Sequence, residues 1–437
     1  MQTESRLQTR QEEFMASFSA PDQLRRREVF AVELRRESRS RQVQLKRTTT
    51  RKGDIGQTDA EGRPVPESQL TQRCPGLCEA LPLSEKLALV TDLLDLQESN
   101  LETVQALRWV RRLFQDAGLG QLCARQLLSA VAESCARPSV ELEASWALAN
   151  LTASASSVED LLTEFPLLRT LLQRADPRVN EHGLYILGNL LSNGKAFPKQ
   201  AVNSYLHKEV VALLMRQRQV EAIKRVGCWV LSVFLRYRLE LSVVLTLVEA
   251  LACFREDASR TVQSYLLSAV LGVSHWEDLY LKLLFQHDLV RPVVRRMPSL
   301  EGEELMRALC VCVNISAGDA YCVQKLLDLA LLDILQPLLA HSSNSVRARA
   351  LESLSNVAYG STEQVYQLLQ HSCFLPALCL LQDHSFVLKN EAATLLLNVC
   401  LSGERSHLER LLDLDVFQLV HSALEHKESG LLMVLHT

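Results

Sequence analysis

Apolar residues recur at helical spacing from about residue 81 onward, and short polar breaks separate the apolar runs. Apolar positions three and four residues apart form one face of a helix, whereas a half-buried strand alternates apolar and polar residues. The alternation typical of strands is not seen in this stretch. The pattern therefore predicts an all-α protein whose main domain covers residues 81–437.

The helical stretch repeats itself. VELEASWALANL (Val140–Leu151) and VNEHGLYILGNLL (Val179–Leu191) each place an apolar residue ten positions before an asparagine. The asparagine position is held by Asn150, Asn189, Asn314, Asn356 and Asn398, and in two further copies by Val233 and Ala269, with spacings of 39, 44, 36, 45, 42 and 42 residues. A period near 40 in a helical chain is typical of armadillo or HEAT arrays. We predict a superhelical solenoid of roughly eight armadillo repeats.

An asparagine at a fixed place in every repeat has two interpretations. It can satisfy backbone groups at a helix end, as polar ladders in solenoids do. Alternatively, a row of asparagines along one surface offers a donor and an acceptor in each repeat, and this pair suits the main chain of an extended peptide. The asparagines alone leave both interpretations open.

Aromatic residues stand four positions before the asparagine position in four consecutive copies, on the same helical face. They are Trp146, Tyr185, Trp229 and Tyr265. A row of rings can hold the aliphatic stems of lysine or arginine and attract their charged heads. Core packing explains any single ring, but a run of four in a chain with 5% aromatic residues favours binding. The predicted peptide-binding groove comprises Trp146, Asn150, Tyr185, Asn189, Trp229, Asn314, Asn356 and Asn398.

Charge divides the chain into a basic head and an acidic body. Residues 1–52 hold 13 basic and 7 acidic side chains, and residues 53–437 hold 34 and 44. We expect a disordered N-terminus over residues 1–23, a basic helical segment over 24–52 and a flexible linker over 53–80. The basic segment suits a nucleic-acid arm, a nuclear localisation tail or a helix that docks on an acidic protein. Its apolar residues, Leu34 among them, and the acidic body favour docking on a protein.

Other candidate chemistry is sparse. A Gly-rich phosphate loop, a nucleophile elbow and a metal-spaced His/Glu pair are all missing from the sequence, so we expect no enzyme, no cofactor and no metal site. One cysteine pair in the linker, Cys74 and Cys78, cannot complete a four-ligand zinc site. The apolar stretches Val226–Leu235 and Leu241–Phe254 fall short of the roughly 18–20 apolar residues of a membrane span, so we expect buried helices.

Together these motifs resemble importin-α, the armadillo adaptor of nuclear import. WALANL and YILGNLLSNG are similar to its asparagine-bearing third helices, and RRR, VELRR and LKR in the head are similar to its importin-β-binding segment. The residues that carry the second similarity are Arg25, Arg26, Arg27, Glu33, Leu34, Arg35, Arg36, Arg39, Arg41, Leu45, Lys46 and Arg47.

The resemblance implies an adaptor that binds importin-β through the head and nuclear-localisation peptides in the groove, and that shuttles between cytoplasm and nucleus. It implies no nucleic-acid partner. Thr48 replaces a basic residue of the family segment, and Glu352 and Thr394 replace groove tryptophans. Lysine-rich signals are therefore expected to bind weakly. The alternative is an armadillo scaffold or chaperone with one dedicated protein partner.

Overall fold

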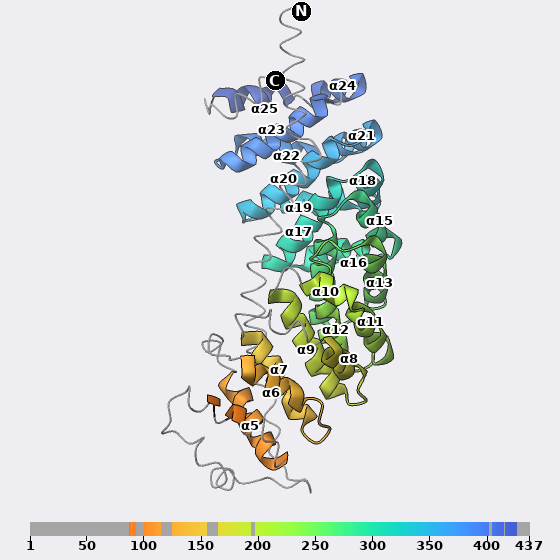
Figure 1. Ribbon diagram of the computed structural model, residues 1–437. Helices are drawn as coiled ribbons and strands as arrows, with labels where there is room; N and C mark the ends of the chain where they lie inside the picture. Colours follow the sequence, from red (N-terminus) through yellow and green to blue (C-terminus); the bar gives the residue numbers. More distant parts are fainter. Residues whose placement is uncertain are drawn as a thin grey trace, which may run out of the picture. The chain divides into compact units, whose positions relative to one another are not determined.

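The computed structural model describes residues 87–88, 90–92, 94, 100–114, 125–154, 165–193, 197–401, 404–414 and 416–425. Within these ranges every regular element is a helix (Figure 1). The all-α prediction is confirmed. The basic segment Arg25–Arg47, the linker and the pair Cys74 and Cys78 lie outside the described residues.

The described residues belong to two compact units, an N-terminal unit that ends at Ala250 and a C-terminal unit that begins at Leu251. The N-terminal unit contains α5 (Asn100–Leu113), α6 (Arg125–Ser134), α7 (Glu141–Ser154), α8 (Phe165–Gln173), α9 (Pro177–Asn193), α10 (Phe197–Asn203), α11 (Leu206–Arg216) and α12 (Glu221–Phe234), and α13 (Leu241–Ala252) spans the boundary. Helices α5, α7, α9 and α12 pack against one another in chain order (Figure 1). Shorter helices pack against α7, α9 and α12, as α8 does against α9.

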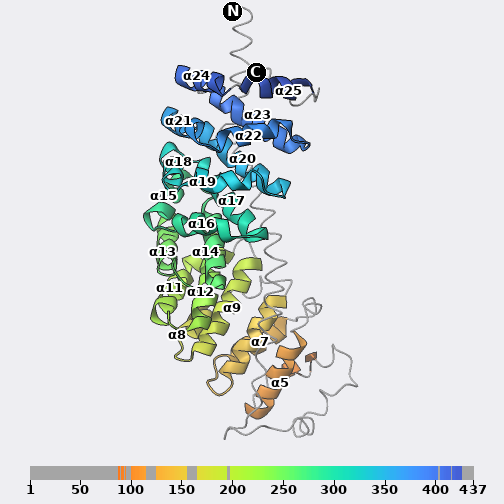
Figure 2. The ribbon, with the colours of Figure 1, turned by 180° about the vertical axis from the view of Figure 1, so that it is seen from behind.

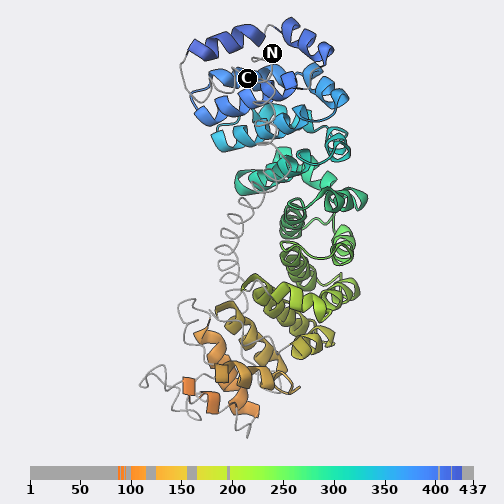
Figure 3. The same ribbon diagram turned by 45° about the horizontal axis from the view of Figure 1, so that its top comes forward.

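The C-terminal unit repeats a pattern of two short helices and one long helix. Its elements are α14 (Arg260–Val273), α15 (Asp278–Gln286), α16 (Val290–Arg296), η4 (Met297–Ser299), α17 (Gly302–Ser316), α18 (Ala320–Leu327), α19 (Leu331–Leu338), α20 (Asn344–Ala358), α21 (Thr362–Gln370), α22 (Phe374–Cys379), η5 (Leu380–Gln382), α23 (Phe386–Leu401), α24 (Arg405–Asp413) and α25 (Val416–Glu425). The long helices α14, α17, α20 and α23 pack in chain order, and α18, α21 and α24 follow one another along the stack (Figure 2). The blue helices of this unit lie side by side in Figure 3.

Three helices per repeat, with the longest last, is the armadillo arrangement. We call the long closing helix of each repeat its third helix. Eight third helices lie within the described residues, namely α5, α7, α9, α12, α14, α17, α20 and α23. The armadillo fold and the expectation of about eight repeats are therefore confirmed.

The two most apolar stretches are buried helices, as the sequence predicts. Val226–Leu235 falls largely in α12, and from Val226 to Leu235 every side chain is buried. Most of Leu241–Phe254 forms α13. No helix in the described ranges is both long and apolar enough to cross a bilayer.

A hydroxyl residue near the end of the third helix recurs in the array. The Thr152 hydroxyl donates to the Ala149 carbonyl oxygen at 2.9 Å. The Ser316 hydroxyl donates to the Val313 carbonyl oxygen at 3.0 Å. In both helices the hydroxyl residue follows the asparagine by two positions and its acceptor precedes the asparagine by one. Each of these hydroxyls also accepts the amide of the next asparagine, Thr152 from Asn189 and Ser316 from Asn356, both at 3.2 Å. The two bonds together mark the asparagine position independently of the sequence alignment.

The same geometry corrects the register of the repeat that contains α14. The Ser274 hydroxyl donates to the Leu271 carbonyl oxygen at 2.8 Å and accepts the Asn314 amide at 2.9 Å, which places Gly272 at the asparagine position. The assignment of Ala269 to this position is therefore wrong. Val262, which is fully buried, stands ten positions before Gly272, as the repeat pattern requires. The spacings on either side become 39 and 42 residues, closer to the period of the other copies.

Candidate binding surface of the third helices

Each asparagine of the predicted groove donates its side-chain amide backward to the preceding third helix. The bonds run from Asn150 to the Arg111 carbonyl at 3.0 Å, Asn189 to the Ala149 carbonyl at 3.0 Å, Asn314 to the Ser274 hydroxyl at 2.9 Å, Asn356 to the Val313 carbonyl at 3.1 Å and Asn398 to the Ser355 carbonyl at 2.9 Å. We call this row the asparagine ladder. Four of its five members are buried, and Asn356 is half-buried.

The ladder gives the asparagines the structural role that was one of their two interpretations. Their amide N–H groups bond to carbonyl and hydroxyl groups near the ends of the preceding third helices, so each third helix is tied to the one before it. Asn189 Oδ1 is buried and has no hydrogen-bond partner within the described residues. The amide N–H groups that would donate to a peptide main chain are thus already bonded within the array. Contact between the ladder and a bound segment stays a prediction.

Removal of one ladder amide is expected to destabilise the protein. Asn398→Ala deletes the donor to both the carbonyl and the hydroxyl of Ser355, in a residue that is only 5% exposed. Leaving the buried acceptors unpaired is expected to lower the free energy of unfolding by about 1–2 kcal/mol. Chemical denaturation followed by circular dichroism measures the loss. The exposed Gln370 gives the control, since Gln370→Ala is expected to change stability by less than about 0.5 kcal/mol. Equal stability of the two variants would argue against a structural ladder.

The ring of Trp146 is covered by an arginine of the same protein. The Arg111 guanidinium carbon lies 4.0 Å from the centroid of the Trp146 ring. Arg111 comes from α5 and Trp146 from α7, so the contact joins two neighbouring third helices. A guanidinium over an indole face at this distance is a cation–π pair. The place that the sequence assigns to a partner's basic side chain is therefore taken by Arg111.

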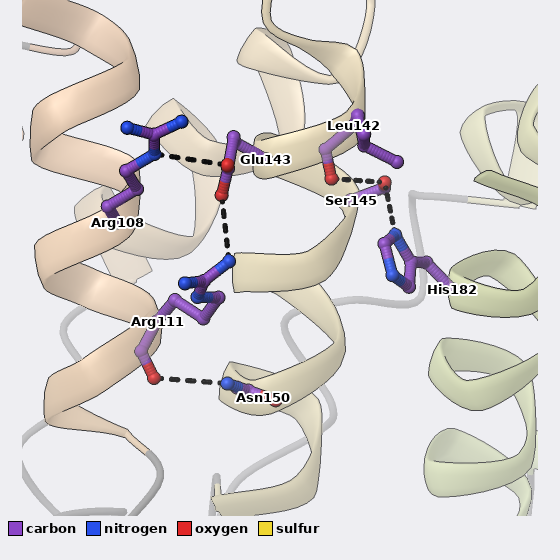
Figure 4. Close-up of polar contacts among 7 residues, drawn as sticks. All are labelled: Arg108, Arg111, Leu142, Glu143, Ser145, Asn150 and His182. Atoms are coloured by element: carbon purple, nitrogen blue, oxygen red, sulfur yellow. Dashed lines mark hydrogen bonds and ion pairs between the residues drawn. The ribbon is translucent and has the colours of Figure 1, made fainter. Parts of the chain in front are cut away.

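One carboxylate holds two arginines beside this ring (Figure 4). Glu143 Oε1 lies 3.1 Å from Arg108 Nε, and Glu143 Oε2 lies 3.1 Å from Arg111 Nη1. The two side chains differ in exposure, with Arg108 at 27% and Arg111 at 16%. We call Arg108, Arg111 and Glu143 the arginine pair site. One carboxylate thus serves two guanidinium groups at this site.

The ring of His182 lies 5.5 Å from that of Trp146, measured between centroids, and adds no charge at neutral pH. Its Nδ1 is 2.9 Å from the Ser145 hydroxyl, which itself donates to the Leu142 carbonyl (Figure 4). Because that hydroxyl has a single hydrogen, Nδ1 is assigned as the protonated nitrogen of the neutral ring. Burial, aided by the nearby charge of Arg111, lowers the pKa of His182 to about 4. The imidazole is therefore neutral when Arg108 and Arg111 are charged.

The next repeat repeats the pairing of acid and arginine. Arg225 of α12 lies 3.3 Å from both Glu181 Oε1 and the Tyr185 hydroxyl of α9. Burial raises the pKa of Glu181, although Arg225 opposes this shift. The Tyr185 ring is half-buried and its centroid lies 6.0 Å from that of Trp229. Side chains of α12 thus contact both the hydroxyl and the ring of Tyr185.

Trp229 lies inside the stack of third helices. It is 6% exposed, and a Cβ added at Gly188 of α9 would overlap its ring. Glycine is required there because the indole occupies the space of a side chain. Tyr265 stands seven positions before Gly272, so the corrected register removes it from the aromatic row. The row that the sequence predicts therefore reduces to two half-buried rings, Trp146 and Tyr185, and one buried ring, Trp229.

Carboxylates on the third helices of the C-terminal unit are also paired with arginines. Glu304 lies 3.2 Å from Arg260. Glu303 pairs with Arg307, and Glu352, at a position where the resemblance predicts a ring, pairs with Arg349. The pair of Glu304 and Arg260 joins two helices and spans 44 residues, so local sequence pattern does not show it. The other two pairs stand four and three positions apart on one helix, a spacing that the sequence does show.

Comparisons with known proteins concern the fold. Neither a family model nor a curated protein matches the chain. An engineered protein solved by a structural genomics consortium is similar over 84% of this chain and 92% of its own, with a TM-score of 0.67 and 19% identity. A designed armadillo repeat protein matches 54% of this chain and 100% of its own (TM-score 0.49, 20% identity). Another, solved in complex with the peptide (KR)4, matches 62% and 97% (TM-score 0.44, 18% identity).

Proposed function

We propose that this protein is an adaptor that binds an extended segment of a partner protein along its third helices, and that it is not an enzyme. The observation that carries the proposal is the recurrence of polar and aromatic side chains at one place in successive third helices. Trp146 and Tyr185 are half-buried there, so part of each ring faces solvent. A row of side chains on successive third helices can contact several residues of a partner chain in an extended conformation.

In its finer form, the proposal is an import adaptor that shuttles between cytoplasm and nucleus. Its support is the basic head, in which RRR, VELRR and LKR are similar to the importin-β-binding segment of importin-α. The nine basic residues of Arg25–Arg47 would pair with carboxylates of importin-β. The cargo would be a protein segment held on the third helices.

Binding of the full-length protein to purified importin-β tests the import role. Calorimetry is expected to detect tight binding by the wild type. The double variant Arg35→Glu, Arg36→Glu is expected to bind at least about a hundredfold more weakly, because each reversal replaces an attractive charge pair with a repulsive one. No binding by the wild type at low salt would sink the import role and leave the adaptor function to be tested by its cargo.

A second candidate is a scaffold or chaperone for one dedicated protein partner. The specific observation in its favour is the arginine pair site, where Arg111 already covers Trp146 and Glu143 is already ion-paired. A surface that has filled its own slot would be a poor receptor for general basic signals. This candidate predicts that removal of residues 24–52 leaves partner binding unchanged. The import adaptor predicts that the same deletion abolishes binding to importin-β.

A further inference from the structure

The arginine pair site places two guanidinium groups close together on the face that the adaptor would use. Glu143 is shared between them, and His182 of the neighbouring helix α9 is neutral at physiological pH. Both arginines belong to α5 and Glu143 to α7, and these two helices pack together. The site therefore presents guanidinium groups in fixed positions to whatever segment lies across these helices.

The groups that could receive a basic side chain here are already in use. Arg111 covers the Trp146 ring, and both oxygens of Glu143 contact arginines. On the next third helix, Glu181 is paired with Arg225. A lysine or arginine from a partner would have to displace one of these contacts and would come close to Arg108 and Arg111 while doing so.

Arg108 offers the opposite chemistry. It bonds to Glu143 through Nε, and no partner is seen for its two terminal nitrogens within the described part of the chain. In Figure 4 the dashed line to Glu143 begins at Nε, and the two terminal nitrogens lie above it with no dashed line. With 27% of the side chain exposed, the terminal N–H groups can be reached from solvent. A guanidinium edge of this kind binds the two oxygens of a carboxylate or a phosphate.

We infer that the partner segment carries an acidic side chain that pairs with Arg108, and that this surface rejects lysine-rich segments. The inference rests on the proposed adaptor function and names the class of segment. Carboxylates and phosphorylated side chains share the required chemistry. An acidic protein segment is the occupant to which we commit, and a phosphorylated one differs only in the charge it brings.

Labelled peptides of equal length test the inference on the full-length protein. One alternates glutamate with serine, one phosphoserine with glycine, one lysine with serine and one asparagine with serine. Fluorescence anisotropy is expected to show binding of the glutamate peptide about tenfold tighter than that of the asparagine peptide, with affinity falling as salt is added. The lysine peptide is expected to bind no better than the asparagine peptide. A preference for the phosphoserine peptide over the glutamate peptide would support the anion site and assign it to phosphorylated segments.

Two arginine variants locate the effect. Arg108→Gln is expected to weaken binding of the glutamate peptide about tenfold, and Arg108→Lys, which keeps the charge but loses the planar fork, to weaken it less. Arg169→Gln on α8 is the control because it removes the same charge from another ion-paired arginine, whose side chain is 44% exposed. It is expected to leave the affinity within about twofold of wild type.

The possible failures are distinct. Tighter binding of the lysine peptide than of the glutamate peptide would overturn the inference and leave the adaptor function standing. Unchanged affinity in Arg108→Gln would also overturn it, because the anion would then bind elsewhere. Absence of binding by all four peptides would overturn both the inference and the proposed holding of extended segments.

Discussion

Replacing Trp229 with alanine is expected to lower the free energy of unfolding by about 3–5 kcal/mol. The indole is 6% exposed and lies against Gly188 of α9 and the ring of Tyr185. Because Gly188 has no side chain to move into the vacated space, the cavity would remain largely open. The expected loss is therefore at the upper end of the range for large-to-small substitutions.

Trp146→Ala is the matched control for Trp229→Ala, because it removes the same side chain from the same place in the repeat, two repeats earlier in the chain. Trp146 is half-buried, so its removal is expected to cost about 1–2 kcal/mol less than that of Trp229. Urea denaturation followed by circular dichroism measures both losses. Equal losses would contradict the prediction, because the two tryptophans would then contribute alike to the core.

Acidification is expected to destabilise the protein through His182. The folded-state pKa of this imidazole is lowered from 6.5 to about 4, so the unfolded chain binds its proton more readily. Stability is therefore intact above pH 6.5, falls as the pH drops through the interval between 6.5 and about 4, and stays reduced below it. The half-buried position of the ring limits the expected loss to about 2–3 kcal/mol.

His182→Gln tests this origin, since glutamine retains a hydrogen-bonding group near Ser145 and has no proton to gain. Free energies of unfolding measured from pH 7 to pH 4 are expected to fall more steeply in the wild type than in the variant, by the contribution of His182. The exposed His384 gives the control, and His384→Gln is expected to keep the wild-type slope. A wild-type slope in His182→Gln would assign the acid sensitivity to other groups.

The helical class and the repeat could be predicted from the sequence because both depend on local pattern. An apolar residue ten positions before Asn150, Asn189 and Asn398 marks the start of each third helix, and Val140, Val179 and Leu388 are all buried there. Their burial follows directly from the helical period. The armadillo arrangement then follows from a period near 40 with helices only.

The error at Ala269 arose from giving aromatic spacing more weight than the apolar period. Tyr265 suggested a register in which it continued the row of rings. The competing signal was present in the sequence, since Gly272 is followed two positions later by Ser274, as Asn150 is by Thr152. In this repeat the hydroxyl of Ser274, which bonds to the end of its own helix, marks the register, whereas the aromatic residue Tyr265 does not.

The contact of Arg111 with the ring of Trp146 could not be predicted from the sequence. Arg111 precedes Asn150 by 39 residues, so the period places it on the preceding third helix. Its reach across to Trp146 depends on the side-chain conformation and on the spacing between α5 and α7, which local pattern does not contain. The pairing of Arg108 and Arg111 with Glu143 depends on the same packing.

The asparagine ladder has a direction, because each amide belongs to the later repeat and each acceptor to the earlier one. Leu271 and Ser274 present the same carbonyl and hydroxyl in α14 that Val313 and Ser316 present in α17. If the intervening repeat were excised whole, Asn356 would meet the acceptor that Asn314 uses. Whole repeats can thus be gained or lost through duplication or exon skipping with the bonding pattern intact. An excision that cuts through a third helix would separate an amide from its acceptor.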